Sequence, residues 1–155
     1  MKQIMIDLQE YLMEVVPQLR HVDRNWNQLS YEQPPVRWPC ALIDIEQIDA
    51  TELRGGRQMA TATVSVTLAD QVLGRTGGGM LPTAVATGAT AAQRESVYAL
   101  IDLCELVRRW LTNYSGHTPG SEYQGLILQN ITHQYSDKSY DVYKLTFSTA
   151  FVMGM

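Results

Sequence analysis

The stretch Met59–Asp70, MATATVSVTLAD, decides the fold class because its side chains alternate strictly in character. One parity carries only small and aliphatic residues, and the other carries hydroxyl groups: Ala60, Ala62, Val64, Val66 and Leu68 against Thr61, Thr63, Ser65 and Thr67. Successive strand side chains point to opposite faces, so this pattern predicts a strand with one buried face and one polar face.

The segment just before it, residues 40–48 (CALIDIEQI), is the natural partner of this strand. Ile43 and Ile45 share one parity, and Ile48 continues the apolar series one step out of phase. Residues 49–58 between the two segments are charged and contain a double glycine. We therefore expect an antiparallel hairpin whose tip projects near Leu53–Arg57.

Helical and strand patterns on both sides of the hairpin complete the order of elements. Apolar residues recur at helical spacing over residues 4–15 and 97–114, which predicts two amphipathic helices, the second capped near Ser96 and ended by Gly116. A short strand is expected over residues 18–24 and two closing strands over 126–135 and 140–153. Residues 25–39 contain three prolines and are expected to form a surface loop, the proline-rich loop, held to the sheet by Trp26, Tyr31 and Trp38. The order α-β-β-β-α-β-β predicts an α+β fold, with two helices on one face of a mostly antiparallel sheet of about five strands.

Composition indicates one soluble domain spanning residues 1–155. The chain is 45% hydrophobic and 18% charged, and its net charge of −4 argues against a dedicated nucleic-acid binder. Asp7, Glu10 and Glu14 interrupt the N-terminal apolar pattern, so we expect neither a signal peptide nor a membrane partner. Cys40 and Cys104 are too few for a disulfide framework, and Cys104 is expected to be a buried thiol.

Residues 71–95, QVLGRTGGGMLPTAVATGATAAQRE, separate the two best patterned parts of the chain. A phosphate loop needs glycines that lead directly into a helix, whereas the predicted helix begins well after this glycine cluster. The segment also lacks the Gly-Lys-Ser/Thr ending of that motif. We interpret it as a flexible insertion or assembly arm, in which Met80 and Leu81 are the apolar anchors.

No constellation of residues predicts catalysis. The three histidines, His21, His117 and His133, are far apart and lack the spacing of zinc ligands. Asp44 and Glu46 share a strand face that is best read as solvated, and no nucleophile-elbow motif is present. We therefore predict no catalytic, cofactor-binding or metal-binding residues, and no enzymatic activity.

Between Leu53 and Arg94 the chain carries four arginines and one carboxylate, Asp70, although the whole chain is acidic. One interpretation is a set of solvated loop charges, and the other is attachment of projecting loops to an acidic neighbour such as another copy of this chain. The residues predicted to make such contacts are Leu53, Arg54, Arg57, Arg75, Met80 and Leu81.

The whole layout resembles the tail terminator (tail-completion) and neck proteins of long-tailed bacteriophages. The resemblance runs through VVPQLRHV, RWPCALIDI, RQMATATVSVTLAD, SVYALIDLCELVRRWL and YDVYKLTFSTAFV, and it covers nearly all of the chain, although the family has no signature motif. The insertion at 71–95 is longer and richer in glycine than such a small domain requires, so the class within the family stays open.

This resemblance implies a homo-oligomeric ring, commonly a hexamer, that caps the tail tube and presents a docking surface to the head. The implied partners are the tail tube protein and a head-completion or connector protein, with DNA only as cargo in the lumen. The implied location is the virion tail or neck, reached from the bacterial host cytoplasm. Two alternatives stay open: a small-molecule-binding or enzymatic domain with residues 71–95 as a lid, and an adaptor that pairs through an exposed strand edge.

Overall fold

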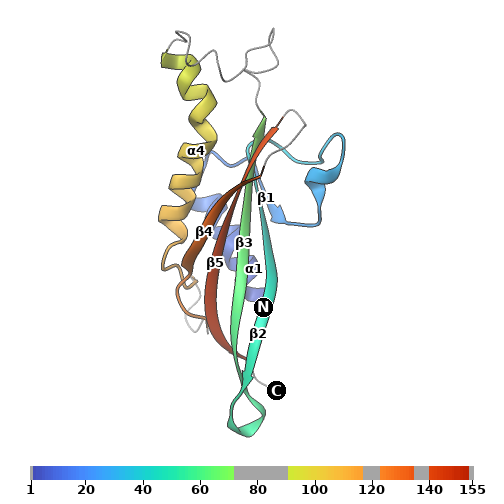
Figure 1. Cartoon of the computed structure of the whole chain (residues 1–155), viewed down its shortest axis with the longest axis vertical. Helices are drawn as coiled ribbons and strands as arrows, with labels where there is room; N and C mark the ends of the chain where they lie inside the picture. The colour runs from blue at the N-terminus through green and yellow to red at the C-terminus, as the bar shows by residue number, and fades with distance from the viewer. Residues whose placement is uncertain (1, 72–90, 117–122, 135–139, 154–155) are drawn as a thin grey trace.

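The computed structural model describes residues 2–71, 91–116, 123–134 and 140–153, with the backbone alone for 91–97. Two helices and five strands follow in the order α-β-β-β-α-β-β, which confirms the predicted α+β class. Their bounds are α1 Lys2–Val15, β1 His21–Arg24, β2 Cys40–Glu52, β3 Gln58–Gln71, α4 Ala91–Leu111, β4 Ile127–Gln134 and β5 Tyr140–Met153. Figure 1 shows the long, twisted sheet with α1 behind it and α4 along one side.

The sheet has the strand order β1-β2-β3-β5-β4, so β3 lies at its centre. Antiparallel ladders join β2 to β3, β3 to β5 and β5 to β4, and only β1 runs parallel to its neighbour β2. The register between β2 and β3 shifts between Ile45 and Gln47, which marks a bulge. This bulge places Ile48 on the same face as Ile45, and it explains the one-step break in the apolar pattern of β2.

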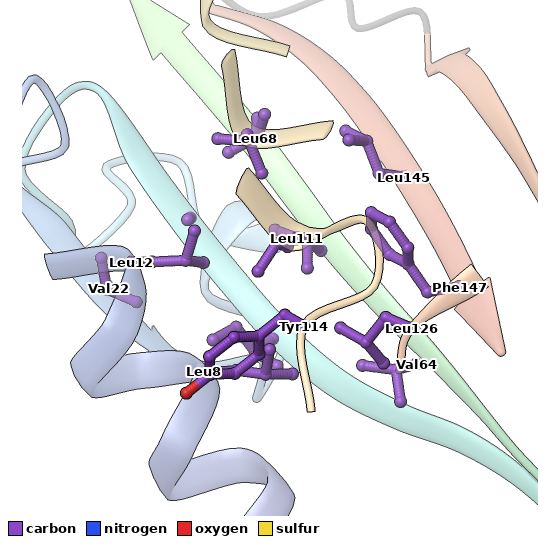
Figure 2. Packing of buried hydrophobic residues seen from close by; sticks show 14 of the residues in the cluster. Leu8, Leu12, Val22, Val64, Leu68, Leu111, Tyr114, Leu126, Leu145 and Phe147 are labelled. Carbon is purple, nitrogen blue, oxygen red and sulfur yellow. The ribbon is translucent and has the colours of Figure 1, made fainter. Parts of the chain in front are cut away.

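Both helices pack on the face of the sheet that carries the aliphatic residues of β3. Leu8 and Leu12 of α1, Leu111 at the end of α4 and Phe147 of β5 are all fully buried in one cluster. Figure 2 shows these side chains directed toward one another above the sheet. The predicted assignment of buried and polar parities in β3 is therefore confirmed: Ala60, Ala62, Val64, Val66 and Leu68 all belong to this core.

The opposite face of the sheet, called here the polar face, carries a smaller apolar cluster at one end only. There Cys40, Leu42, Ala69, Tyr140 and Val142 are buried beneath the proline-rich loop. Trp38 stacks on Tyr140 with 5.3 Å between ring centroids, as expected for a residue that holds this loop to the sheet. The same expectation was wrong for Trp26 and Tyr31, which are 49% and 52% exposed and pack edge to face on each other.

Helix α4 differs from its predicted bounds at both ends. It begins at Ala91, because the run AAQRE has high helix propensity even though it lacks an apolar stripe. It ends at Leu111, before Gly116, because Asn113 adopts a left-handed conformation (φ 65°) and its N–H donates to the C=O of Leu126. The predicted insertion at 71–95 lies mostly outside the described residues; Gln71 ends β3.

A buried carboxylate ties α1 to the segments that follow α4. Asp7 is only 3% exposed, and its Oδ2 accepts a hydrogen bond of 2.8 Å from the hydroxyl of Tyr123. Gln3 Nε2 donates to the other carboxylate oxygen at 2.7 Å. Burial, followed by this hydrogen bond, raises the pKa of Tyr123. A buried charge needs such partners, so this network fixes where α1 lies relative to Tyr123.

Two adjacent residues of α1 test the packing of the helix face. Leu12 is fully buried, whereas Met13 is 62% exposed. We expect Leu12→Ala to lower the free energy of unfolding by about 2–5 kcal/mol, because it leaves a cavity in a close-packed core. Met13→Ala, its matched control, should change that free energy by less than about 0.5 kcal/mol. Urea titration followed by circular dichroism measures both; equal effects would contradict the assignment of α1's buried face.

Candidate assembly surface

The tip of the β2–β3 hairpin is a five-residue turn with a defined backbone. Glu52 and Gln58 form the last cross-strand pair, and the N–H of Leu53 donates to the C=O of Arg57 at 2.8 Å. Gly55 and Gly56 both have positive φ, 78° and 74°, which side-chain-bearing residues rarely adopt. The double glycine seen in the sequence is therefore what allows the chain to reverse here.

The hairpin extends beyond the helices, as the lower end of Figure 1 shows. Every residue from Asp49 to Met59 is exposed, so neither face of the two strands is covered in this stretch. Leu53 and Met59 are 39% and 40% exposed, although both are apolar. The prediction of a projecting tip is confirmed.

Arg54 and Arg57 give this tip two positive charges. Neither guanidinium forms an ion pair with another residue in the described part of the chain. A third predicted contact residue, Leu53, lies between them and the end of β2. Arginine and exposed aliphatic groups together are typical of protein interfaces, so this surface is suited to contact with another protein.

The remaining predicted contact residues, Arg75, Met80 and Leu81, lie outside the described residues. Arg94 falls in the first turns of α4, where only the backbone is described. The structure therefore brings together one of the two predicted groups, the hairpin tip, and leaves the group in the insertion as a prediction.

An open groove of about 640 Å³ lies between α4, the end of β3 and the residues Gln18 and Pro39, which precede β1 and β2. Its polar side chains include Asp70, Asp102, Glu105 and Arg109. Burial raises the pKa of Asp70, while the N–H of Gln71 and the charge of Arg20 act in the opposite direction. The groove had no local signal in the sequence, because Asp70 and the α4 residues are far apart along the chain.

His133 and both cysteines lie within the described residues, whereas His117 lies outside them. His133 Nε2 lies 2.5 Å from Asp141 Oδ1, and its ring stacks on Tyr143 with 4.5 Å between centroids. Cys104 is buried, as predicted, and Cys40 is buried on the other face of the sheet. No group of His, Cys, Asp or Glu within the described ranges has the geometry to hold a metal ion.

Sequence reasoning missed two exposed aromatic or apolar sites near the hairpin and the loop. Met59 lies on the same face of β3 as the threonines, and it is exposed because it lies beyond the covered part of the sheet. The sequence pattern does not show where that covered part ends. Trp26 and Tyr31 were expected to be covered, but they form an exposed pair with 5.7 Å between ring centroids.

Neither α1 nor α4, over its described residues, is long and apolar enough to span a membrane.

Comparison with known proteins identifies the fold. No family model and no curated protein matches the chain. Among solved structures 27 chains match, including one from the virion of a native gene transfer agent particle. That chain is 11% identical in sequence, and the alignment has a TM-score of 0.58 and covers 98% of this chain and 96% of the other. The likeness spans nearly the full length of both chains, and it shows a shared fold.

The burial of the two thiols can be tested through their reactivity and through the pH dependence of stability. Burial raises the pKa of both Cys40 and Cys104 from 9.0 to about 12. The folded state therefore favours the neutral thiols, and the stability this contributes is complete below pH 9 and is lost as the pH rises toward 12. We expect both thiols to be inert to a disulfide reagent at pH 8 until the chain is unfolded.

Thiol titration with and without denaturant measures this reactivity, and thermal melts from pH 7 to 11 measure the stability. Two results would contradict the burial of these groups: fast reaction of either cysteine in the folded protein, or a melting temperature that increases as the pH is raised beyond 9.

Proposed function

We propose that this protein is a structural component of a phage or prophage virion, which assembles into a homo-oligomeric ring that caps the tail tube or joins the tail to the head. Two lines support the proposal. The sequence layout resembles tail terminator and neck proteins, and the fold is shared with a chain of a gene transfer agent virion. Its place would then be the tail or neck, reached from the host cytoplasm.

The proposal rests mainly on one observation: the β2–β3 hairpin extends beyond the hydrophobic core. Strand β3 has 14 residues and spans about 46 Å, while α1 with its 14 residues spans only about 21 Å. The exposed stretch Asp49–Met59 gains little burial in a monomer, yet its ordering costs conformational entropy. Contact with another subunit or with the tail tube would offset that cost, because it would bury Leu53 and Met59.

The charges support protein partners, with DNA only as passing cargo. The chain has a net charge of −4, whereas a surface that grips phosphates needs an excess of Lys and Arg. The two arginines of the tip are suited to carboxylates on a neighbouring protein, where guanidinium groups bind in a bidentate manner. Within this proposal the tail tube protein, the head-completion protein and further copies of this chain are the partners.

One observation favours the second candidate function, a small-molecule-binding or enzymatic domain. The groove beside α4 brings Asp70, Asp102, Glu105 and Arg109 around one open space. Ligand binding there would stabilise the folded state by RT ln(1 + L/Kd), where L is the free ligand concentration, so the melting temperature would rise with ligand concentration. Thermal melts across a panel of cationic and zwitterionic metabolites test this candidate; no shift with any of them would remove it.

Assembly is the first test of the ring. We expect size-exclusion chromatography with light scattering, at high protein concentration or with tail tubes present, to give one discrete multiple of the 17.4 kDa chain. Negative-stain electron microscopy should show annular particles or capped tube ends. A chain that stays monomeric at high concentration and does not bind tail tubes would contradict the proposal.

Shortening the hairpin tests the role of its tip. Replacing residues 53–57 by Asn-Gly keeps Glu52 and Gln58 as the closing pair and supplies a two-residue hairpin turn. Because the tip is exposed, we expect the thermal midpoint to change little. Binding to tail tubes should fall at least tenfold in a sedimentation assay. Arg54→Lys with Arg57→Lys keeps the charge of the tip but removes the bidentate guanidinium groups, so this variant should lose only part of the binding. Unchanged binding by the shortened chain would rule out the tip as a contact.

A further inference from the structure

Strand β4 is an edge strand that lacks the usual protection against pairing. It forms one border of the sheet and pairs with β5. Its sequence, ILQNITHQ, contains neither Pro nor Lys nor any carboxylate, and the residues from Asn130 to Gln134 pair regularly. Ile127 and Ile131 are 58% and 38% exposed. Exposed edges of this kind are templates for another strand.

The other border of the sheet has a matching opening. Strand β1 pairs only with Cys40–Ile43, so over the described residues β2 is open on that side from Asp44 to Glu52. A groove of about 400 Å³ lies there between α1 and β2. Its apolar wall is formed by Met5, Ile6, Ile45 and Ile48, and Lys2, Gln9, Arg24 and Asp44 complete its lining. This groove is on the helix face, because Ile45 pairs with Val64 and Ile48 with Ala62.

Strand directions make the two borders compatible in a ring. Three successive antiparallel ladders separate β2 from β4, so β4 runs opposite to β2. Rotation about an axis roughly along the strands preserves these directions. Strand β4 of one copy would therefore meet β2 of the next copy in antiparallel orientation, and the contact would be heterologous, as ring closure requires.

The faces agree as well. Ile131 pairs with Leu145, which belongs to the core on the helix face, so the exposed Ile131 side chain points to that same face. In a continuous sheet it would lie over the groove between α1 and β2 of the next copy. Ile127 pairs with Ser148 and therefore points to the polar face, away from this groove.

We propose that β4 of one copy adds to the open edge of β2 in a second copy, with Ile131 seated in the groove formed by Met5, Ile6, Ile45 and Ile48. This inference rests on the proposed ring and names the contact that builds it. The ladders through β5 and β3 place Gln134 level with Cys40. Because the open edge of β2 begins only at Asp44, full pairing requires each copy to be displaced along the strands by about four residues relative to the next. Tilted strands in closed barrels provide such a stagger.

A pair of matched substitutions on β4 tests the contact. Ile131→Lys places a charge against the apolar wall of a groove that also carries Lys2 and Arg24, whereas Ile127→Lys adds the same charge to the same strand on the opposite face. Both positions are exposed, so both variants should fold, which circular dichroism checks. We expect light scattering to show loss of the ring for Ile131→Lys, with at least a tenfold rise in the monomer fraction, and retention of the ring for Ile127→Lys.

The alternative outcomes separate the two proposals. Rings in both variants would overturn edge pairing and leave the virion function standing. Loss of the ring in both would overturn the placement of Ile131 in the groove. A wild-type chain that forms no oligomer, alone or on tail tubes, would overturn the function and this contact together.

Disulfide trapping gives a second measurement that does not depend on weakening the assembly. The native Cys40 and Cys104 are buried, so introduced cysteines can be oxidised selectively. Ile131→Cys combined with Ile48→Cys should give a ladder of covalent oligomers under mild oxidation, and neither single variant should do so. Dimers from Ile131→Cys alone would show that β4 pairs with another β4, which would contradict the proposed contact.

Discussion

Strand β3 is hydrogen-bonded along both of its edges, and its alternation of side chains places the other elements. Both helices pack on the face of β3 that carries the aliphatic side chains, because only there can Leu8, Leu12 and Leu111 be buried. The hydroxyl parity leaves the opposite face polar. On that face an ion pair between Glu46 and Lys144 spans β3. The layered arrangement, with one covered face and one open face, follows from this one strand.

The local pattern predicted the fold class because each long element has an amphipathic period of its own. Ile48 lies one step out of phase in the sequence pattern, and the bulge in β2 explains this. The pattern failed where other forces act. Helix α4 starts at Ala91, in a run of high helix propensity without an apolar stripe, and it ends early because the N–H of Asn113 donates to the C=O of Leu126, far along the chain. The buried Thr149, which interrupts the apolar series of β5, is explained only by its hydroxyl donating to the C=O of Gln124 at 2.6 Å.

The same reasoning applies to the candidate contact surface. Leu53, Arg54 and Arg57 could be placed from sequence, because a charged turn between two alternating segments must lie at a hairpin tip. The open edges could not, since strand order depends on long-range pairing. Nothing local to ILQNITHQ shows that it borders the sheet or that β1 covers only four residues of β2. Both surfaces have one physical cause, namely a sheet that is larger than the core available to cover it.

The central claim is that these uncovered strands are completed by other copies of the chain. Hydrogen–deuterium exchange on the free and the assembled protein tests it most directly, because strand pairing protects backbone amides. The account predicts slower exchange on assembly within Ile127–Gln134 and Asp44–Glu52, and unchanged exchange in the buried centre of β3. Equal exchange rates for both edges in the free and the assembled states would contradict it.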